Sequence, residues 1–281
     1  MIFAGIDSGS WNTKAVVIDD NARVLGTAVT RSGADLSAAA EHVYRTVLER
    51  AGCTRDEVAA VWCTGFGRQC VTFANGSRTE LDCHGRGAAH YVAGPLVVID
   101  IGGQDAKVIR LDASGQRLSH RMNRKCAAGT GSFLDEIALR LGIPIERMDA
   151  LANGSTEELD LSSFCTVFAG TELLTLIRGG KRPTDLAMAA YRSLTKRIVA
   201  LDVLQGRVVA TGGVIAHHPT MVKLLGRELH AEIVVPPHPQ EMGAFGAALA
   251  ARDGATSVGP IPVELERGQP LTATGGIAHA T

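Results

Sequence analysis

The chain alternates between short apolar runs and longer segments whose apolar residues recur at helical spacing. The apolar runs predict buried strands over 2–6, 15–18, 96–99, 108–111 and 207–214. The helical spacing predicts helices over 37–52, 132–141, 184–204 and 242–251. Glycines at 52 and 142 are typical of helix ends. Because strands and helices alternate along the chain, the predicted fold class is α/β.

Two of the predicted strand pairs enclose the same short motif. Residues 7–14 (Asp-Ser-Gly-Ser-Trp-Asn-Thr-Lys) and 100–107 (Asp-Ile-Gly-Gly-Gln-Asp-Ala-Lys) share the form D-x-G-x-x-x-x-K. Each copy lies between two apolar runs, which predicts a strand, a tight turn and a second strand. Glycine in such a turn lets backbone amides approach a phosphate closely, and an aspartate at a strand end can hold hydrated magnesium. The repeat therefore indicates two phosphate-binding turns in two related lobes.

A third segment extends this interpretation. Residues 207–214 (Arg-Val-Val-Ala-Thr-Gly-Gly-Val) form a predicted buried strand whose end at Gly212 and Gly213 suits close approach by a nucleoside, although a plain strand-to-helix turn explains it as well. We expect the first lobe to span 1–90 and to be rejoined by 240–256, and the second to span 91–239. Residues 257–281, rich in proline, glycine and threonine, are expected to form a loose tail.

Composition and charge narrow the classes of partner. With 281 residues, 46% of them hydrophobic and 20% charged, the chain can build one large domain or two lobes. Its 28 basic and 29 acidic residues give no electrostatic reason to expect nucleic acid or an anionic membrane surface as partner. No apolar run approaches the roughly 20 residues of a membrane helix, and no signal peptide is expected because the first residues run into a strand. We expect a cytoplasmic protein.

The six cysteines carry the next signal. They include no C-x-x-C pair, and a chain of this size needs no disulfides, so reduced thiols are expected. Cys126 stands just before a glycine-rich helix start, and Cys165 opens a second predicted helix. A helix N-terminus stabilises a thiolate, and the same field suits an iron–sulfur cluster. Because a cubane cluster needs four thiolates, a twofold dimer contributing two from each subunit is the simplest arrangement. Ordinary packing stays open as the alternative.

Two phosphate turns facing one cleft, followed by a late Gly-Gly strand, resemble the actin, hexokinase and heat-shock-protein-70 ATPase superfamily. The resemblance covers residues 2–251 and implies a two-lobed actin-like ATPase fold, with ribonuclease-H-like lobes and nucleotide in the interlobe cleft. By itself it leaves a sugar kinase, a chaperone ATPase, a filament protein and an ATP-driven activator open.

Three segments make the resemblance more specific. Residues 98–105 (Val-Ile-Asp-Ile-Gly-Gly-Gln-Asp), 125–131 (Lys-Cys-Ala-Ala-Gly-Thr-Gly) and 164–169 (Phe-Cys-Thr-Val-Phe-Ala) are similar to those of the ATP-dependent activators of 2-hydroxyacyl-CoA dehydratases and the ATPase subunits of benzoyl-CoA reductases. This resemblance implies a homodimer, or a heterodimer with a related subunit, that holds one [4Fe-4S] cluster. It also implies ATP or ADP with Mg²⁺, reduced ferredoxin or flavodoxin as electron source, and an iron–sulfur dehydratase or reductase as electron acceptor.

The motifs assign roles to individual residues. The resemblance makes Cys126 and Cys165 the cluster ligands. We predict that Asp7, Gln104 and Asp105 take part in hydrolysis. The predicted nucleotide-binding residues are Ser8, Gly9, Ser10, Thr13, Lys14, Asp100, Gly102, Gly103, Gly212 and Gly213.

The chain departs from the family pattern at two positions. Gly170 stands where family members often have an acid, and Trp11 is bulkier than the small polar residue expected in the first turn. Two rival functions stay open. A small-molecule kinase of the same superfamily would explain the two turns, and so would a nucleotide-switched scaffold protein, but neither gives the paired cysteines a role.

Overall fold

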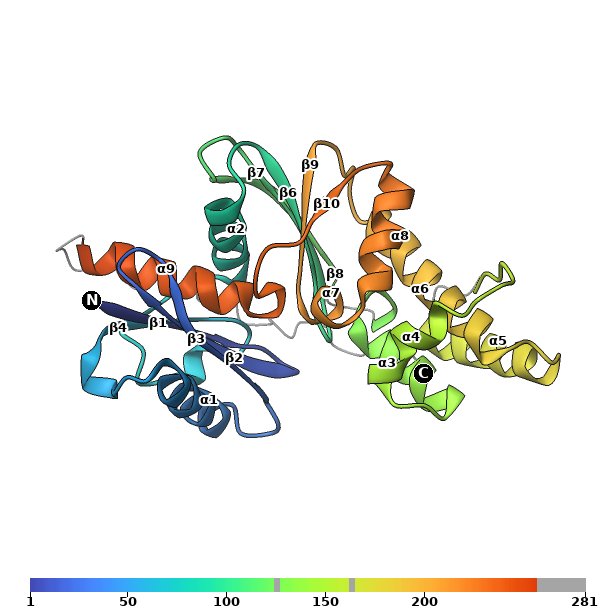
Figure 1. Ribbon diagram of the computed structural model, residues 1–281, viewed down its shortest axis with the longest axis horizontal. Helices are drawn as coiled ribbons and strands as arrows, with labels where there is room; N and C mark the ends of the chain where they lie inside the picture. The colour runs from blue at the N-terminus through green and yellow to red at the C-terminus, as the bar shows by residue number, and fades with distance from the viewer. Residues whose placement is uncertain (124–126, 162–164, 257–281) are drawn as a thin grey trace, which may run out of the picture.

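Two five-stranded mixed sheets form the two halves of the molecule (Figure 1). The computed structural model describes residues 1–123, 127–161 and 165–256. The first sheet has the strand order β3 (Val24–Arg31), β2 (Asn12–Asp19), β1 (Ile2–Ser8), β4 (Val58–Thr64), β5 (Gly76–Ser77). The second has the order β8 (Arg117–Asn123), β7 (Ala106–Leu111), β6 (Leu96–Ile101), β9 (Arg207–Thr211), β10 (Ile233–Val234).

The two sheets share one topology. In each, a central strand pairs antiparallel with the next strand in sequence and parallel with a later one: β1 pairs with β2 and β4, and β6 with β7 and β9. The hairpin then continues antiparallel into β3 in the first sheet and into β8 in the second. The repeated motif therefore belongs to a strand arrangement that is itself repeated in both sheets.

Helices cover the sheets and join them. They are α1 (Leu36–Ala51), α2 (Glu80–Tyr91), α3 (Gly131–Leu141), α4 (Met148–Ala152), α5 (Thr166–Arg178), α6 (Pro183–Val199), α7 (Gly213–His217), α8 (Pro219–Leu229) and α9 (Met242–Thr256). Short 3₁₀ turns occur at Arg55–Glu57, Arg68–Cys70, Ala127–Gly129, Ile145–Arg147 and Pro239–Glu241. In the described parts of the chain, no helix is long and apolar enough to cross a membrane.

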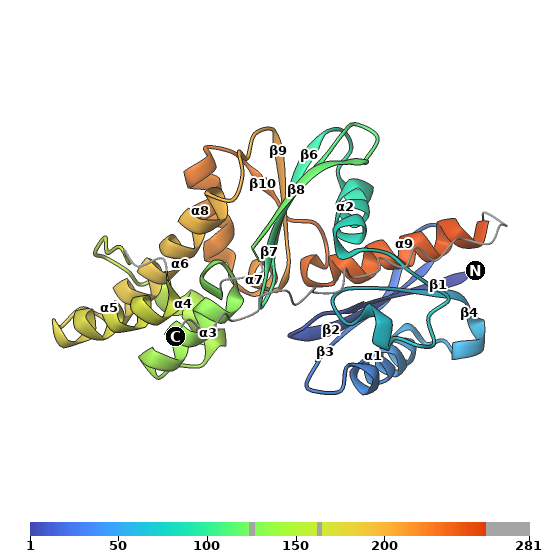
Figure 2. The ribbon, with the colours of Figure 1, turned by 180° about the vertical axis from the view of Figure 1, so that it is seen from behind.

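The apolar core divides along the sheets. Helix α1 buries Val43 and Val47 on one face of the first sheet, and α9 packs Phe245 against the other face. In the second half, α3, α6 and α8 cover the sheet with a larger cluster that includes Phe133 and Tyr191. Figure 2 shows α2 beside the second sheet and next to α9, so these two helices connect the halves.

Helix α9 approaches its neighbours through bare backbone. A Cβ atom at Gly5 of β1 would lie 1.9 Å from the carbonyl oxygen of Ala244, and one at Gly246 would lie 1.8 Å from that of Cys83 in α2. Only glycine allows these distances. The last helix is thereby fixed against the first strand, beside the end of β1 that carries the first motif.

Most predicted elements agree with the structure, and two of the helices end at the glycines that the sequence indicated. Gly52 and Gly142 adopt left-handed φ values of 67° and 68° at the ends of α1 and α3. The helix predicted over 184–204 ends earlier, at Val199. Beyond the helix, Asp202 accepts a hydrogen bond from the backbone of Val203 and another from Arg110 of β7.

Candidate functional site

The first turn of the site joins β1 to β2. Their register pairs Asp7 with Lys14, and the Lys14 ammonium donates to Asp7 Oδ2 at 3.0 Å. Asp7 is buried, with 4% of its surface exposed, so this charge pairing offsets the desolvation of its carboxylate. A Cβ at Gly9 would lie 3.3 Å from Lys14 Nζ. Because glycine has no side chain, the lysine can reach the turn.

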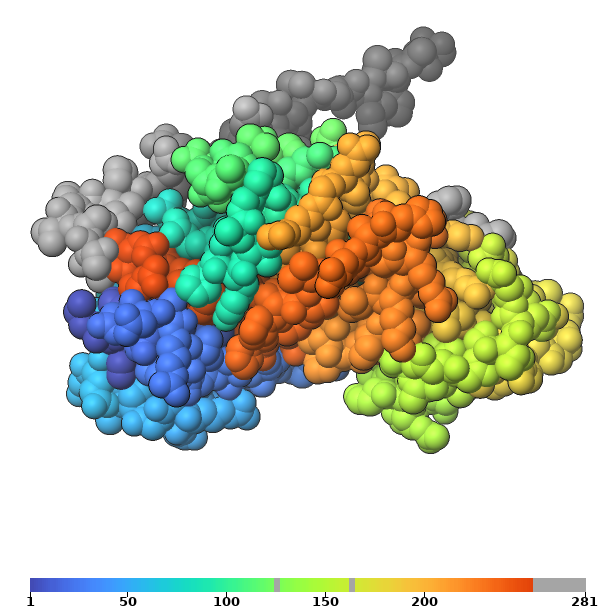
Figure 3. All heavy atoms as spheres, turned by 45° about the horizontal axis from the view of Figure 1, so that its top comes forward, coloured from blue at the N-terminus to red at the C-terminus, as the bar shows by residue number. Residues whose placement is uncertain are grey.

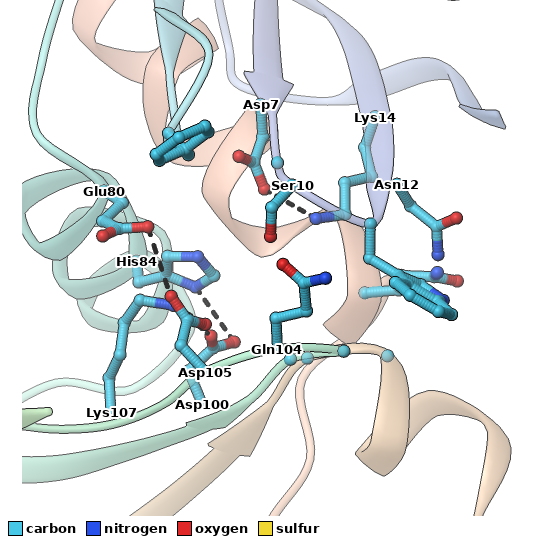
Figure 4. A pocket seen from close by; sticks show the side chains of 18 residues that line it. Asp7, Ser10, Asn12, Lys14, Glu80, His84, Asp100, Gln104, Asp105 and Lys107 are labelled. Atoms are coloured by element: carbon cyan, nitrogen blue, oxygen red, sulfur yellow. Dashed lines mark hydrogen bonds and ion pairs between the residues drawn. The ribbon is translucent and has the colours of Figure 1, made fainter. Parts of the chain in front are cut away.

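The second turn repeats this geometry. Strands β6 and β7 pair Asp100 with Lys107, the same two motif positions as Asp7 and Lys14. Lys107 Nζ lies 3.2 Å from Asp100 Oδ2 and 2.7 Å from Asp105 Oδ1. Gly102 closes the turn by donating its amide to the carbonyl of Asp105 at 2.9 Å. The two turns face one pocket, and Figure 4 shows Gln104 extending from the second turn toward Ser10 of the first.

The two lysines differ in their charge environment. Lys14 has one carboxylate partner, whereas Lys107 also lies 3.7 Å from Glu80 Oε2 and so faces three acids. Burial opposes protonation of Lys107, but Asp100, Asp105 and Glu80 together raise its pKa above the ordinary value. This lysine is therefore held charged within the second turn.

Helix α2 supplies two pocket residues that the sequence analysis missed, Glu80 and His84. They lie one helical turn apart, and His84 Nδ1 is 3.2 Å from Asp100 Oδ1 without good hydrogen-bond alignment. Burial opposes ionisation of Asp100, yet His84, Lys107 and a hydrogen bond from Thr211 hold its pKa well below the usual range. The spacing E-x-x-x-H was a usable signal, but glycines in the same segment hid its helix.

The Gly-Gly segment forms the third wall of the pocket. Gly212 has a φ of 99°, and a Cβ there would lie 2.4 Å from the carbonyl oxygen of Ile101. Its amide donates to Pro239, and Gly213 lines the pocket together with Gln240. Close backbone packing against β6 thus places this segment beside the second turn.

The pocket encloses about 590 Å³, open solvent at its mouth included. Its lining includes most of the predicted nucleotide and catalytic residues, namely Asp7, Gly9, Ser10, Lys14, Asp100, Gly102, Gly103, Gln104, Asp105, Gly212 and Gly213. Ser8 and Thr13 lie outside this lining. The Thr13 hydroxyl instead forms a hydrogen bond with the Ser32 hydroxyl at 2.9 Å, and the Ser32 hydroxyl donates to the carbonyl of Gly9. The hydroxyls of Thr13 and Ser32 thus support the first turn from outside the pocket.

The pocket chemistry suits a metal–nucleotide complex. Lys14 offers positive charge to phosphates, and the glycine turns offer backbone amides. Within the described residues, no group of three or more histidine, cysteine, aspartate or glutamate side chains is arranged to hold a metal ion alone. Magnesium needs no such cage, because it keeps several waters and takes one or two carboxylates together with phosphate oxygens. Asp7 and Asp100 are the buried carboxylates that could serve.

The one described residue of the predicted cluster site, Cys165, lies at the start of α5 in the second half of the molecule. Cys165 is exposed and stands at the N-cap of α5, where the backbone amides of Phe168 and Val167 hold the pKa of its thiol below the ordinary value. Cys126 lies outside the described residues. Figures 1 and 3 show the end of the molecule that carries α5 projecting away from the first lobe.

The other cysteines differ sharply from Cys165. Burial raises the pKa of Cys63 to about 11 and that of Cys83 still further, and burial also raises the pKa of Cys53. Such thiols stay protonated and pack as small apolar side chains. Among the described cysteines whose pKa departs from the ordinary value, only Cys165 is shifted toward the thiolate.

Arg197 of α6 contacts residues that follow Cys126 in the sequence and also lies close enough to Cys165 to affect its pKa. Its guanidinium donates to the carbonyl of Ala128 at 3.1 Å, stacks over Phe133 at 4.7 Å and helps to lower the pKa of Cys165. Ala128 follows Cys126 by two positions. Arg197 thus holds Ala128 and the start of α3 near the start of α5.

Gly170, where an acid was expected, lies against the side chain of Arg140 of α3. A Cβ at this position of α5 would lie 2.6 Å from Arg140 Nε of α3. The Arg140 guanidinium fills this space and pairs with Glu136 on its own helix at 2.7 Å.

The fold and pocket define a two-lobed ATPase of the actin-like class. The profile of the BadF/BadG/BcrA/BcrD ATPase family matches residues 4–251, so the chain belongs to this family. The 2-hydroxyisocaproyl-CoA dehydratase activator of Clostridioides difficile is 35% identical over 258 residues, covering 91% of this chain and 96% of the relative. The (R)-2-hydroxyglutaryl-CoA dehydratase activating ATPase of Acidaminococcus fermentans is 36% identical over 251 residues, covering 88% and 95%.

A solved structure supports the same assignment. The activator of the 2-hydroxyisocaproyl-CoA dehydratase from Clostridium difficile with bound ADPNP superposes with a TM-score of 0.85 at 34% identity, covering 91% of this chain and 96% of that one. These findings confirm the predicted family, the two-lobed fold and the ATPase class.

Proposed function

We propose that this chain is an ATP-dependent low-potential electron donor. Its [4Fe-4S] cluster, shared at a dimer interface, would pass one electron to a partner iron–sulfur enzyme such as a 2-hydroxyacyl-CoA dehydratase or benzoyl-CoA reductase. One observation carries the proposal: the chain combines paired Asp–Lys turns around a pocket with an exposed, activated thiol at the start of α5. Family membership favours this function over the kinase and scaffold alternatives.

The pocket residues divide the work of hydrolysis. Asp7 and Asp100 would hold hydrated Mg²⁺, while Lys14 and the turn amides would bind the phosphates. Asp105 is engaged with Lys107 at 2.7 Å, whereas Gln104 makes no hydrogen bond within the described residues. We therefore assign Gln104 the positioning of the attacking water and Asp105 the positioning of Lys107.

The thiol of Cys165 fits a cluster ligand for a physical reason. A ligand must be a thiolate, and the helix-start amides that lower the pKa of Cys165 also stabilise a negatively charged group beside it. With Cys126 as the second ligand from each subunit, the bound cluster would supply the low-potential electron. Reduced ferredoxin or flavodoxin would be the electron source, in the cytoplasm, where thiols stay reduced.

The experiment is anaerobic purification with iron analysis of cysteine variants. We expect a brown protein with about four irons per pair of subunits, as the shared cubane requires. Cys126→Ala and Cys165→Ala should each lose the iron and keep the binding of Mg²⁺-ADP, because neither cysteine is among the described residues that line the pocket. Cys53→Ala, in the first lobe, is the matched control and should keep its iron.

Two results would contradict the proposal. One is full iron content in either ligand variant. The other is a colourless wild-type protein that hydrolyses ATP only when a small-molecule acceptor is added, which would favour the kinase.

A further inference from the structure

Trp11 connects the two phosphate turns directly. It lies in the first turn, and a Cβ at Gly103 of the second turn would be 2.8 Å from its Cγ and 3.0 Å from its Cδ1. The indole therefore rests on the bare backbone of Gly103. From its own lobe, Arg31 covers the ring, with the guanidinium carbon 5.0 Å from the ring centroid. One side chain thus contacts both phosphate turns at the pocket.

Hydrogen bonds connect the second phosphate turn to the start of α3. The carbonyl of Gly103 accepts hydrogen bonds from the Ser132 amide at 2.8 Å and the Ser132 hydroxyl at 2.5 Å, and the carbonyl of Gly102 accepts one from the Gly131 amide at 2.9 Å. These donors belong to the first turn of α3. A Cβ at Gly131 would lie 3.3 Å from the Cα of Gly103, so the contact is tight on both sides.

Helix α3 cannot follow the turn without carrying its surroundings. Its Phe133, Leu134 and Ile137 are fully buried in the core of the second lobe. The helix begins five positions after Cys126. A displacement of the second turn is therefore delivered to the start of α3 through three hydrogen bonds and not through a flexible connection.

We infer that Trp11 is a positioning residue that couples the first phosphate turn to α3. When nucleotide draws the lobes together, the indole presses on Gly103, and the Gly103–Ser132 hydrogen bonds carry the displacement to the helix that follows Cys126. The inference rests on the proposed function, since it describes how the nucleotide pocket acts on the predicted cluster site. It also gives the unexpectedly large side chain at position 11 a role.

The test follows amide hydrogen exchange in the anaerobically purified full chain. With saturating Mg²⁺ and a non-hydrolysable ATP analogue, exchange over residues 131–134 should slow by about fivefold or more, the size of an ordinary allosteric coupling. In Trp11→Ala this response should fall below about twofold, and Trp11→Phe should restore most of it because a ring remains on Gly103. Ser132→Ala should weaken the response with Trp11 in place.

The outcomes separate this inference from the proposed function. If Trp11→Ala keeps the wild-type exchange response at saturating analogue, or if the wild type binds the analogue without any response in α3, the coupling is wrong. If the wild type responds but carries no iron, the proposed electron transfer is wrong and the coupling stands. Saturation removes the influence of any change in affinity, and a purely structural role of Trp11 would not be rescued selectively in the nucleotide-bound state.

Discussion

At the scale of single residues, burial and charge give the same residue type different roles. Lys14 and Lys107 occupy equivalent motif positions, yet one faces a single carboxylate and the other three. The motif spacing predicted most pocket residues. It could not predict Glu80 and His84, because their position depends on how α2 packs between the lobes.

Replacing Lys107 should damage stability more than replacing Lys14. Lys107→Met leaves the buried Asp100 without its closest cation, and removal of one partner from a buried ion pair costs about 3–5 kcal/mol. Lys14→Met should cost roughly 1–3 kcal/mol, since Lys14 is less buried than Lys107 and pairs with one carboxylate, that of Asp7. Urea unfolding at pH 7 measures both. Equal losses would show that the three-acid environment does not matter.

A buried histidine should make the fold sensitive to acid. Burial lowers the pKa of His218 to about 4, and its Nδ1 pairs with the Tyr191 hydroxyl at 2.7 Å. The unfolded chain binds this proton near pH 6.5, so its contribution is complete above that pH and declines as the pH falls toward 4. The loss from this group should approach about 3 kcal/mol by pH 4.

Urea midpoints at pH 7 and pH 4.5 measure the effect. His218→Gln should flatten the decline, because the glutamine does not titrate. His42→Gln is the matched control, since His42 is exposed on α1 and is not among the groups that shift the pKa of His218, and it should leave the decline as in the wild type. An unchanged slope in His218→Gln would assign the acid sensitivity to other groups.

At the scale of elements, the sequence pattern predicted helices and strands that bury one apolar face. It missed elements whose formation depends on packing against the rest of the fold. Strand β8 has exposed residues on both faces over most of its length, so it carries no apolar alternation. Helix α2 contains Gly85 and Gly87, which disfavour a helix locally. Gly87 serves the packing of the helix instead, because a Cβ there would lie 2.6 Å from the sulfur of Met242 in α9.

The contact between α2 and α9 should tolerate no added atom at its centre. Gly246→Ala places a methyl group on the backbone carbonyl of Cys83, which no side-chain rotation relieves, and should cost at least about 2 kcal/mol. Gly226→Ala in α8 is the control. Its Cβ would lie 3.2 Å from a carbonyl, and the gain in helix propensity should keep the change within about 1 kcal/mol. Thermal unfolding of both variants decides, and similar melting temperatures would contradict the prediction.

At the scale of the whole molecule, the duplicated motif was sufficient to predict two lobes around one pocket. The strand order confirms that the duplication extends to both complete sheets. The dimer stays a proposal, and the exposed Val167 and Phe168 beside Cys165 mark the surface where a second subunit would contact the first. The assignment of 1–90 with 240–256 and of 91–239 to separate lobes stays a prediction.

Iron should hold the pair of subunits together. Under anaerobic conditions we expect about 59 kDa, twice the 29.5 kDa of the chain, by light scattering. Chelation of the iron should move the equilibrium toward the single chain, because the four thiolates would then lose their common centre. A 29.5 kDa species that retains its full iron content would contradict the shared cluster.

The position of Trp11 gives the protein an intrinsic optical label. The chain has two tryptophans: Trp62 is buried within the first lobe, whereas the indole of Trp11 lies between a cation and the backbone of the opposite turn. Indole emission depends strongly on such surroundings. Replacing Trp62 by phenylalanine would leave a single fluorophore at the meeting point of the lobes, so that opening and closing could be followed by light, without attached dyes, in the time of one turnover.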